Sequence, residues 1–242
     1  MKNLLTVVGL LSCWAWCATA ARAELVTFTL TLDAPSAAGN RLNLSLLGGA
    51  TTSDLTGTFN AQVDIDRVTG VVSSLDLLDV GVPTITSSDW VINAAMIGQV
   101  NGTGILATMD TNGAPSAVTG GTFLASQQRL RLIAGSVTIP SILYSDTFST
   151  TNTVNIPGID APGTGSLIAT LDAGMGLFNL VFTLPINNSQ EIQPGADLQI
   201  VGNVVARGQI MAVPEPGSLA GLGVLGCLVV SRRWRRRKVG SA

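Results

Sequence analysis

Carboxylates are the side chains of this 242-residue chain best placed to do chemistry. Asp64-Ile65-Asp66 and Asp76-Leu77-Leu78-Asp79 place oxygen donors beside an expected turn and strand end, and oxygen is the donor that Ca²⁺ prefers. The spacing is far from the twelve-residue loop of an EF-hand, and turn-capping aspartates on a solvated strand edge explain it better. We keep Asp64 and Asp66 as calcium candidates, favour the turn-capping interpretation, and expect no cofactor.

Paired carboxylates are also the acid and base of glycoside hydrolases. Nothing in the spacing selects a pair from the five candidates, which are Asp64, Asp66, Asp76, Asp79 and Asp89. Such enzymes usually stack sugar rings on aromatic side chains, and only 5% of residues here are aromatic. The chain has no histidine, and its three cysteines lie near the two ends, which excludes Ser-His-Asp and Cys-His catalysis. We therefore expect that this protein is not an enzyme.

Charge and cysteine content limit the other functions open to the middle of the chain. Between Glu24 and Val213 there are five arginines and fourteen acidic residues, a net charge of −9. An acidic domain repels phosphate backbones, so we expect no nucleic-acid partner. The same region has no cysteine, so it can form no disulfide and must be stabilised by the burial of a core.

The elements that would position these carboxylates are expected to be β-strands. Val26, Phe28 and Leu30 alternate with threonines at the start of the region, as in a half-buried strand. Glu and Lys, which long amphipathic helices favour, are almost missing. Further strands are expected at Arg41–Leu47, Leu55–Ile65, Val71–Leu78, Trp90–Val100, Gly104–Asp110, Arg129–Ile139, Ser166–Asp172, Leu177–Leu184 and Leu198–Met211. Residues 24–212 are thus predicted to form an all-β domain, an antiparallel β-sandwich or jelly-roll.

The clearest expected hairpin joins the segment that ends at Asp66 to the one that begins at Val71. The intervening Arg67-Val68-Thr69-Gly70 ends in a glycine, which can adopt the positive φ that the exit of a tight turn requires.

The N-terminus has the layout of a secretory signal peptide. A basic start at Lys2 precedes an apolar run from Leu4 to Ala18, and small residues at Ala21 and Ala23 suit cleavage before Glu24. We predict a signal peptide over residues 1–23. Leu10-Leu11-Ser12-Cys13 loosely resembles a lipobox, in which Cys13 would carry lipid, and we place this alternative second.

The C-terminus, residues 213–242, has three parts, and here the basic residues follow the apolar stretch, whereas at the N-terminus they precede it. Val213-Pro214-Glu215-Pro216 is held extended by its prolines, which suits the cleft of a processing enzyme. The apolar stretch Leu219–Val230 can enter a bilayer as a helix over residues 217–234, and at about 27 Å it suits a transient anchor. A cluster that would keep the end in the cytoplasm follows, namely Arg232, Arg233, Arg235, Arg236, Arg237 and Lys238.

These three parts, in this order and spacing, resemble the PEP-CTERM sorting signal. The resemblance covers about thirty residues. It implies recognition by a membrane-embedded exosortase, which would act near Pro214-Glu215-Pro216 and release the protein to the cell surface of a Gram-negative bacterium that makes exopolysaccharide. The partners it implies are signal peptidase and exosortase during export, the inner membrane transiently, and exopolysaccharide afterwards.

The sequence favours a non-enzymatic surface or matrix protein, structural or adhesive within an exopolysaccharide layer. Two alternatives remain open, a carbohydrate- or calcium-binding module and a secreted hydrolase that uses carboxylates. A shallow aromatic platform or three converging carboxylates would favour binding, and two carboxylates facing each other across a cleft would favour hydrolysis.

Overall fold

The computed structural model describes residues 23–79, 84–95, 98–139, 144–148, 159–193 and 196–213. In these residues the regular structure is β, apart from one short 3₁₀ turn, η1 (Ala125–Gln127), and no helix there is long and apolar enough to cross a membrane. The strands are β1 (Glu24–Leu32), β2 (Arg41–Leu46), β3 (Gly49–Ile65), β4 (Val72–Leu78), β5 (Ile85–Ser87), β6 (Trp90–Ala94), β7 (Gly98–Thr111), β8 (Ser116–Ala117), β9 (Thr122–Leu124), β10 (Gln128–Ile139), β11 (Tyr144–Phe148), β12 (Ile159–Asp160), β13 (Thr164–Asp172), β14 (Leu177–Gln193) and β15 (Ala196–Met211). The predicted all-β class is confirmed.

The strands pair antiparallel along the path β11-β10-β7-β5-β3-β1-β15-β14-β13-β9. Strand β3 turns the corner of this path, because it pairs first with β2, then briefly with β5, and finally with β1 and β4. The change occurs at Gly57, which has φ +127°, and a Cβ there would lie 2.2 Å from the carbonyl oxygen of Thr84. Only glycine adopts this positive φ readily and has no Cβ that would clash with the Thr84 carbonyl.

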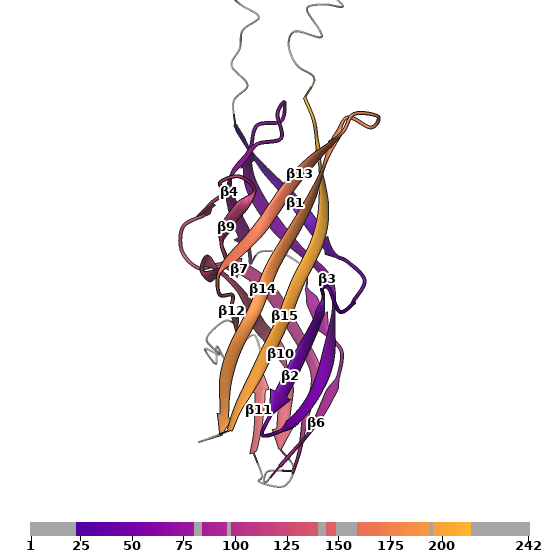
Figure 1. Ribbon diagram of the computed structural model, residues 1–242, viewed down its shortest axis with the longest axis vertical. Helices are drawn as coiled ribbons and strands as arrows, with labels where there is room; N and C mark the ends of the chain where they lie inside the picture. Colours follow the sequence, from indigo (N-terminus) through magenta and orange to yellow (C-terminus); the bar gives the residue numbers. More distant parts are fainter. Residues whose placement is uncertain are drawn as a thin grey trace, which may run out of the picture.

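The folded path brings two layers face to face, and β13, β14 and β15 cross in front of β7 and β10 in Figure 1. Three rings meet between the layers. Phe182 of β14 meets Phe59 of β3 edge to face at 5.4 Å and stacks with Phe123 of β9 at 5.7 Å. The architecture is that of the expected antiparallel sandwich.

The core follows the period of two that the sequence shows. On β1, Leu30 and Leu32 are buried and Val26 and Phe28 pack partly against the core, while the threonines between them point outward. The alternating apolar residues of β3, β14 and β15 bury in the same way. The predicted strand faces are therefore confirmed.

The expected hairpin at Asp66 is present as β3–β4, with Gly70 at φ +77° and its N–H donating to the Asp66 carbonyl at 2.7 Å. One expected strand is different. The run Trp90–Val100 is divided between β6 and β7, which pair as a hairpin. Trp90 lies directly opposite Gly102, whose missing side chain makes room for the indole ring.

Asn40 joins the first strand of the described chain to the last. It is fully buried and has φ +60°, a left-handed conformation that asparagine tolerates better than most residues. Its Nδ2 donates to the carbonyl oxygens of Asp33 (2.9 Å) and Val205 (2.6 Å), and its Oδ1 accepts the N–H of Val205 (2.8 Å). The Asn40 side chain thus continues the hydrogen bonding between the end of β1 and β15 beyond the last backbone pairs.

We predict that Asn40→Ala lowers the free energy of unfolding by about 3 kcal/mol, because it leaves the carbonyl of Asp33 and the N–H of Val205 without the partner that Asn40 supplies in a partly buried place. Urea unfolding measures the change. The matched control is Asn43→Ala on the exposed face of β2, which should alter stability by less than about 0.5 kcal/mol. Equal effects of the two substitutions would contradict the role given to Asn40.

Candidate functional site

The described chain begins and ends at the same end of the domain, the upper end in Figure 1. Glu24 of β1 lies opposite Ile65, the last residue of β3, and Met211 of β15 lies opposite Leu177, the first residue of β14. We call this end the terminal pole. It comprises residues 23–25, the β3–β4 turn (66–71), the β13–β14 turn with its flanking residues (171–177) and residues 211–213.

Arg67 connects the two chain ends. Its Nη1 lies 3.0 Å from Oε2 of Glu24, and its Nε donates to the carbonyl oxygen of Met211 at 2.9 Å. The backbone carbonyl of Arg67 accepts the N–H of Val213 at 2.9 Å. The residue that would follow signal cleavage and the residue that precedes Pro214 are therefore bound to one arginine.

The two turns of the terminal pole have the same hydrogen-bonding pattern. Oδ1 of Asp66 accepts the N–H groups of Val68 and Thr69, and Oδ1 of Asp172 accepts those of Gly174 and Met175. Each turn ends in a glycine with positive φ. The Gly176 carbonyl then accepts the N–H of Ala212 at 2.9 Å, so the second turn also holds the end of β15.

The residues predicted for processing fall partly inside the described chain. Ala23 and Val213 lie at the terminal pole. The remaining residues, which are Ala21, Pro214, Glu215, Pro216, Arg232, Arg233, Arg235, Arg236, Arg237 and Lys238, lie outside the described residues. The roles given to them, the boundaries 1–23 and 213–242, and the helix over 217–234 stay predictions.

The calcium candidates lie at the end of β3. Asp66 caps the β3–β4 turn, and its bonds from backbone N–H groups, that of Val68 foremost, lower the pKa of its carboxyl below the ordinary value. Asp64 lies on the outer side of β3, opposite Leu25 and Ser74 in the two neighbouring strands. Among the described residues, no group of three or more His, Cys, Asp or Glu could hold a metal ion.

Of the other three candidate carboxylates, Asp76 lies opposite Gln62 in the β3–β4 pair, and the other two form separate contacts. Asp79 forms an ion pair with Arg131, and Asp89 accepts the N–H of Gly104 at 2.9 Å. The structure therefore gives these two acids different partners. Sequence patterns gave no sign of these long-range pairs.

Each arginine of the described chain forms an ion pair with a different acid. The other pairs are Arg41–Asp54 (2.7 Å), Arg129–Asp110 (2.6 Å) and Arg207–Asp33 (2.9 Å). The hydrogen bond from Arg41 lowers the pKa of the Asp54 carboxyl.

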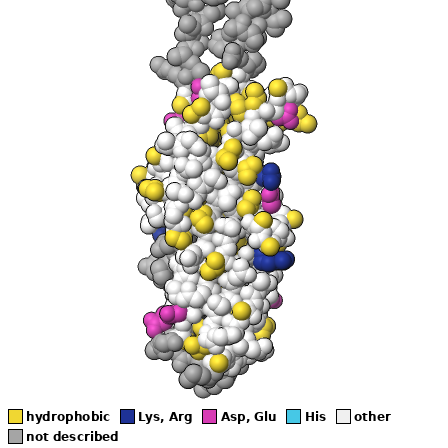
Figure 2. Space-filling view, in the orientation of Figure 1, with side chains coloured by type: hydrophobic (Ala, Val, Ile, Leu, Met, Phe, Trp, Pro, Cys, Tyr) yellow, Lys and Arg dark blue, Asp and Glu magenta, His cyan; other side chains and the backbone are white. Residues whose placement is uncertain are grey.

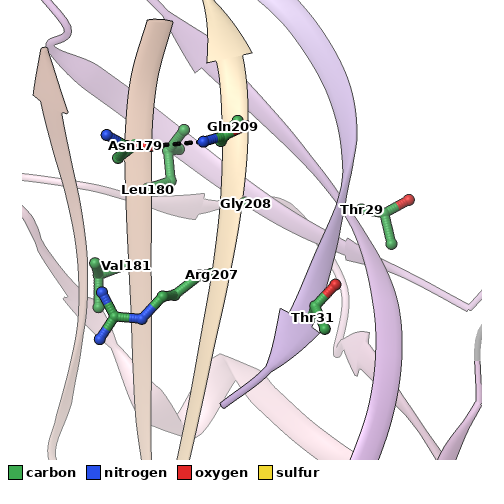
Figure 3. Close-up of a pocket in the computed structure, with 8 residues that line it drawn as sticks. All are labelled: Thr29, Thr31, Asn179, Leu180, Val181, Arg207, Gly208 and Gln209. Atoms are coloured by element: carbon green, nitrogen blue, oxygen red, sulfur yellow. Dashed lines mark hydrogen bonds between the residues drawn. The ribbon is translucent and has the colours of Figure 1, made fainter. Parts of the chain in front are cut away.

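A shallow groove of about 480 Å³ lies where β1 diverges from β15, as Figure 3 shows. The two strands pair at Thr31↔Arg207 and Leu32↔Ala206 and then separate. The groove is lined in part by Thr29, Thr31, Asn179 and Gln209, and Gln209 Nε2 donates to Asn179 Oδ1 at 2.9 Å. Its lining also contains the guanidinium of Arg207, which forms an ion pair with Asp33, and it contains no carboxylate, so it suits hydrogen bonding to a polar ligand better than acid-base catalysis.

Residues 212–237 match the PEP-CTERM protein-sorting motif, which confirms the resemblance derived from the tail. No curated protein and no solved structure matches the chain. The motif implies export with a membrane-anchored sorting signal and processing by an exosortase. Because the match begins at Ala212, the sorting signal starts directly at the terminal pole.

The structure contributes Arg67, which sequence reasoning missed. The turn residues Asp66 and Gly70 could be recognised locally, but the contacts of Arg67 reach 43 residues back to Glu24 and 144 residues forward to Met211.

We predict that Arg67→Ala loosens the C-terminal end of β15. Loss of the bond to Met211 and of the ion pair with Glu24 should make the amides of Ala212 and Val213 exchange about three- to tenfold faster, which corresponds to about 1 kcal/mol. Hydrogen exchange followed by NMR measures this. The control is Arg207→Ala, whose ion pair lies away from the pole; if it accelerates the same amides equally, the assignment to Arg67 is wrong.

We predict a pH-dependent contribution from Asp66. Its folded pKa lies below the unfolded value of about 3.9, so the stability that it contributes is complete above that pH and is lost as the pH falls toward the folded pKa. Urea midpoints measured from neutral to acidic pH should show this loss, and Asp66→Asn should reduce it while keeping an acceptor oxygen. At neutral pH added Ca²⁺ should leave the midpoint unchanged, and an increase that depends on Asp64 and Asp66 would indicate a metal site instead.

Proposed function

We propose that this protein is an exported precursor whose mature domain is a non-enzymatic structural or adhesive component of an exopolysaccharide layer. The observation that carries the proposal is the junction at Arg67, which fixes both processed ends of the domain at the start of a sorting motif. Export and exosortase processing follow from the motif itself. The role of the domain outside the cell is the part that we add.

The terminal pole suits a domain that is attached to a membrane at both ends during export. The signal peptide precedes Glu24 and the apolar tail follows Val213, so both segments leave the same end of the domain. Strand β14 has 17 residues and would extend about 55 Å, which directs the opposite end of the domain away from the membrane. Cleavage after Ala23 and near Pro214-Glu215-Pro216 then frees the domain without cutting a strand.

The outer face of the sheet supports the matrix role. Thr29 Oγ1 donates to Asn60 Oδ1, and Gln62 Nε2 donates to Thr27 Oγ1, so β1 and β3 present paired neutral side chains. The face seen in Figure 2 is mainly neutral, with few charged side chains, and the groove between β1 and β15 combines hydroxyl and amide groups with the ion-paired guanidinium of Arg207. Hydroxyl and amide groups of this kind match the hydroxyl groups of a polysaccharide.

The experiment is the intact mass of the protein recovered from the surface or medium of its own host, with and without the exosortase. We expect a species that begins at Glu24 and ends between residues 214 and 216, and we expect it to disappear without the enzyme. The double substitution of Pro214→Ala and Pro216→Ala should retain the tail, because it removes the extended motif. Pro115→Ala, in an exposed loop, is the matched control and should be processed normally.

The outcomes separate the two parts of the proposal. An intact basic tail in membranes despite active exosortase would make this a tail-anchored protein and would overturn the sorting assignment. Correct processing, followed by release without co-fractionation with the exopolysaccharide of the host, would overturn the matrix role alone.

A further inference from the structure

Exposed apolar side chains are concentrated at the terminal pole. Ten large apolar side chains are exposed among the described residues, and six of them belong to this end of the domain. Their exposed fractions range from 42% for Val213 to 72% for Met175. The six are Leu25, Val71, Leu171, Met175, Met211 and Val213. Single exposed apolar residues are ordinary, whereas a group at one end of a domain indicates a contact surface.

These six side chains come from every segment of the terminal pole. They belong to the start of β1, the exit of the β3–β4 turn, the β13–β14 turn with the strand before it, and the end of β15. Figure 2 shows apolar side chains at the upper end of the visible face, where the β13–β14 turn projects. The fold thus collects them from segments far apart in the sequence.

The charges at the terminal pole are engaged within the domain. Glu24 forms an ion pair with Arg67 at 3.0 Å. The carboxylates of Asp66 and Asp172 accept backbone N–H groups of their own turns. Ion pairs and hydrogen bonds of this kind partly compensate a carboxylate, which reduces the cost of bringing it near a region of low polarity.

The length of the chain beyond the pole decides what can cover this surface. Pro214 to Ser218 are the five residues between Val213 and the apolar stretch that begins at Leu219, and fully extended they span at most about 17 Å. When that stretch lies in a bilayer, the terminal pole is therefore held at the headgroup region. In every precursor molecule the inserted tail keeps the terminal pole next to the bilayer, whereas contact with a second copy of the protein would require two molecules to meet.

We propose that the terminal pole is a membrane-contact surface, which rests its exposed apolar side chains on the bilayer that holds the tail. This inference depends on the proposed function, because the tail must be inserted. The contact holds Val213 at the lipid surface and so presents Pro214-Glu215-Pro216 at the depth where a membrane-embedded enzyme acts. Apolar and interfacial side chains bind at this depth through the burial of their apolar area.

The test uses the precursor after removal of the signal peptide, reconstituted in vesicles of zwitterionic lipid. Cys227→Ser removes the cysteine of the tail, and Val71→Cys then carries an environment-sensitive fluorophore at the pole. We expect a blue-shifted emission that is lost when lipids with a quencher at the headgroup are included. The comparison probe is Val201→Cys, which is 44% exposed in the part of β15 that pairs with β2, and it should show neither effect.

A second set of variants separates contact from simple tethering by the tail. The triple substitution of Leu171→Ser, Met175→Ser and Met211→Ser should abolish the quenching of the probe at Val71. The matched triple substitution of Val91→Ser, Leu124→Ser and Val201→Ser changes exposed apolar residues outside the pole and should leave the quenching intact. All six positions are exposed, so neither set should disturb folding.

The outcomes distinguish this inference from the proposed function. Resistance of the precursor to alkaline extraction reports insertion of the tail. An extractable precursor would overturn the tail-insertion step of the proposed function, and this inference with it. An inserted tail with a water-exposed probe at Val71, or with quenching that survives the loss of the apolar side chains, would overturn the membrane contact alone.

Discussion

The side-chain amide of Asn40 is the contact on which the arrangement of the domain depends. It binds the chain at the end of β1 to the middle of β15, through Asp33 and Val205, and the Asn40 side chain itself is fully buried. A buried backbone group without a partner costs more than the hydrogen bond that it lost, so the site strongly favours one alignment of these two strands. Because β1 and β15 are the first and last strands, this alignment also fixes where the chain enters and leaves the domain.

Because the first and last strands are neighbours, both ends of the described chain lie at one end of the domain. Strand β1 runs away from the terminal pole and β15 returns to it, and Arg67 joins the two at the point where both sequence signals begin or end. The same geometry leaves apolar side chains at that pole and mainly neutral polar groups along the face shown in Figure 2. The common position of the two chain ends and of the exposed apolar side chains is therefore a consequence of one strand order.

Residues 24–213 contain no cysteine and so form no disulfide, and the described interior is stabilised by apolar burial and hydrogen bonds instead. Most of the buried residues are apolar, and the side chains of buried Asn40, Ser53, Asp110, Ser116 and Gln128 form hydrogen bonds. Gln128 is fully buried, accepts from Thr111 at 2.7 Å and donates to Ser116 at 2.6 Å, while Thr111 accepts the N–H of Leu77. This chain of bonds connects β4, β7, β8 and β10, and because each of its side chains has a partner it is compatible with a stable core.

Local patterns in the sequence were sufficient for the fold class, for the outward threonines of β1 and for the Asp66–Gly70 turn, because a side-chain period of two and a glycine of positive φ are properties of a few adjacent residues. The tail was equally readable, since an extended motif, an apolar stretch and a basic cluster act in linear order. The division of Trp90–Val100 into two strands was missed, and the pairing that shows it places Trp90 opposite Gly102, a residue of the partner strand. Tertiary structure alone decided that Arg67 meets Glu24 and Met211, that Asn40 meets Val205, and that six separate apolar side chains share one pole. These contacts join residues up to 165 positions apart, and their existence depends on strand order, which no local pattern encodes.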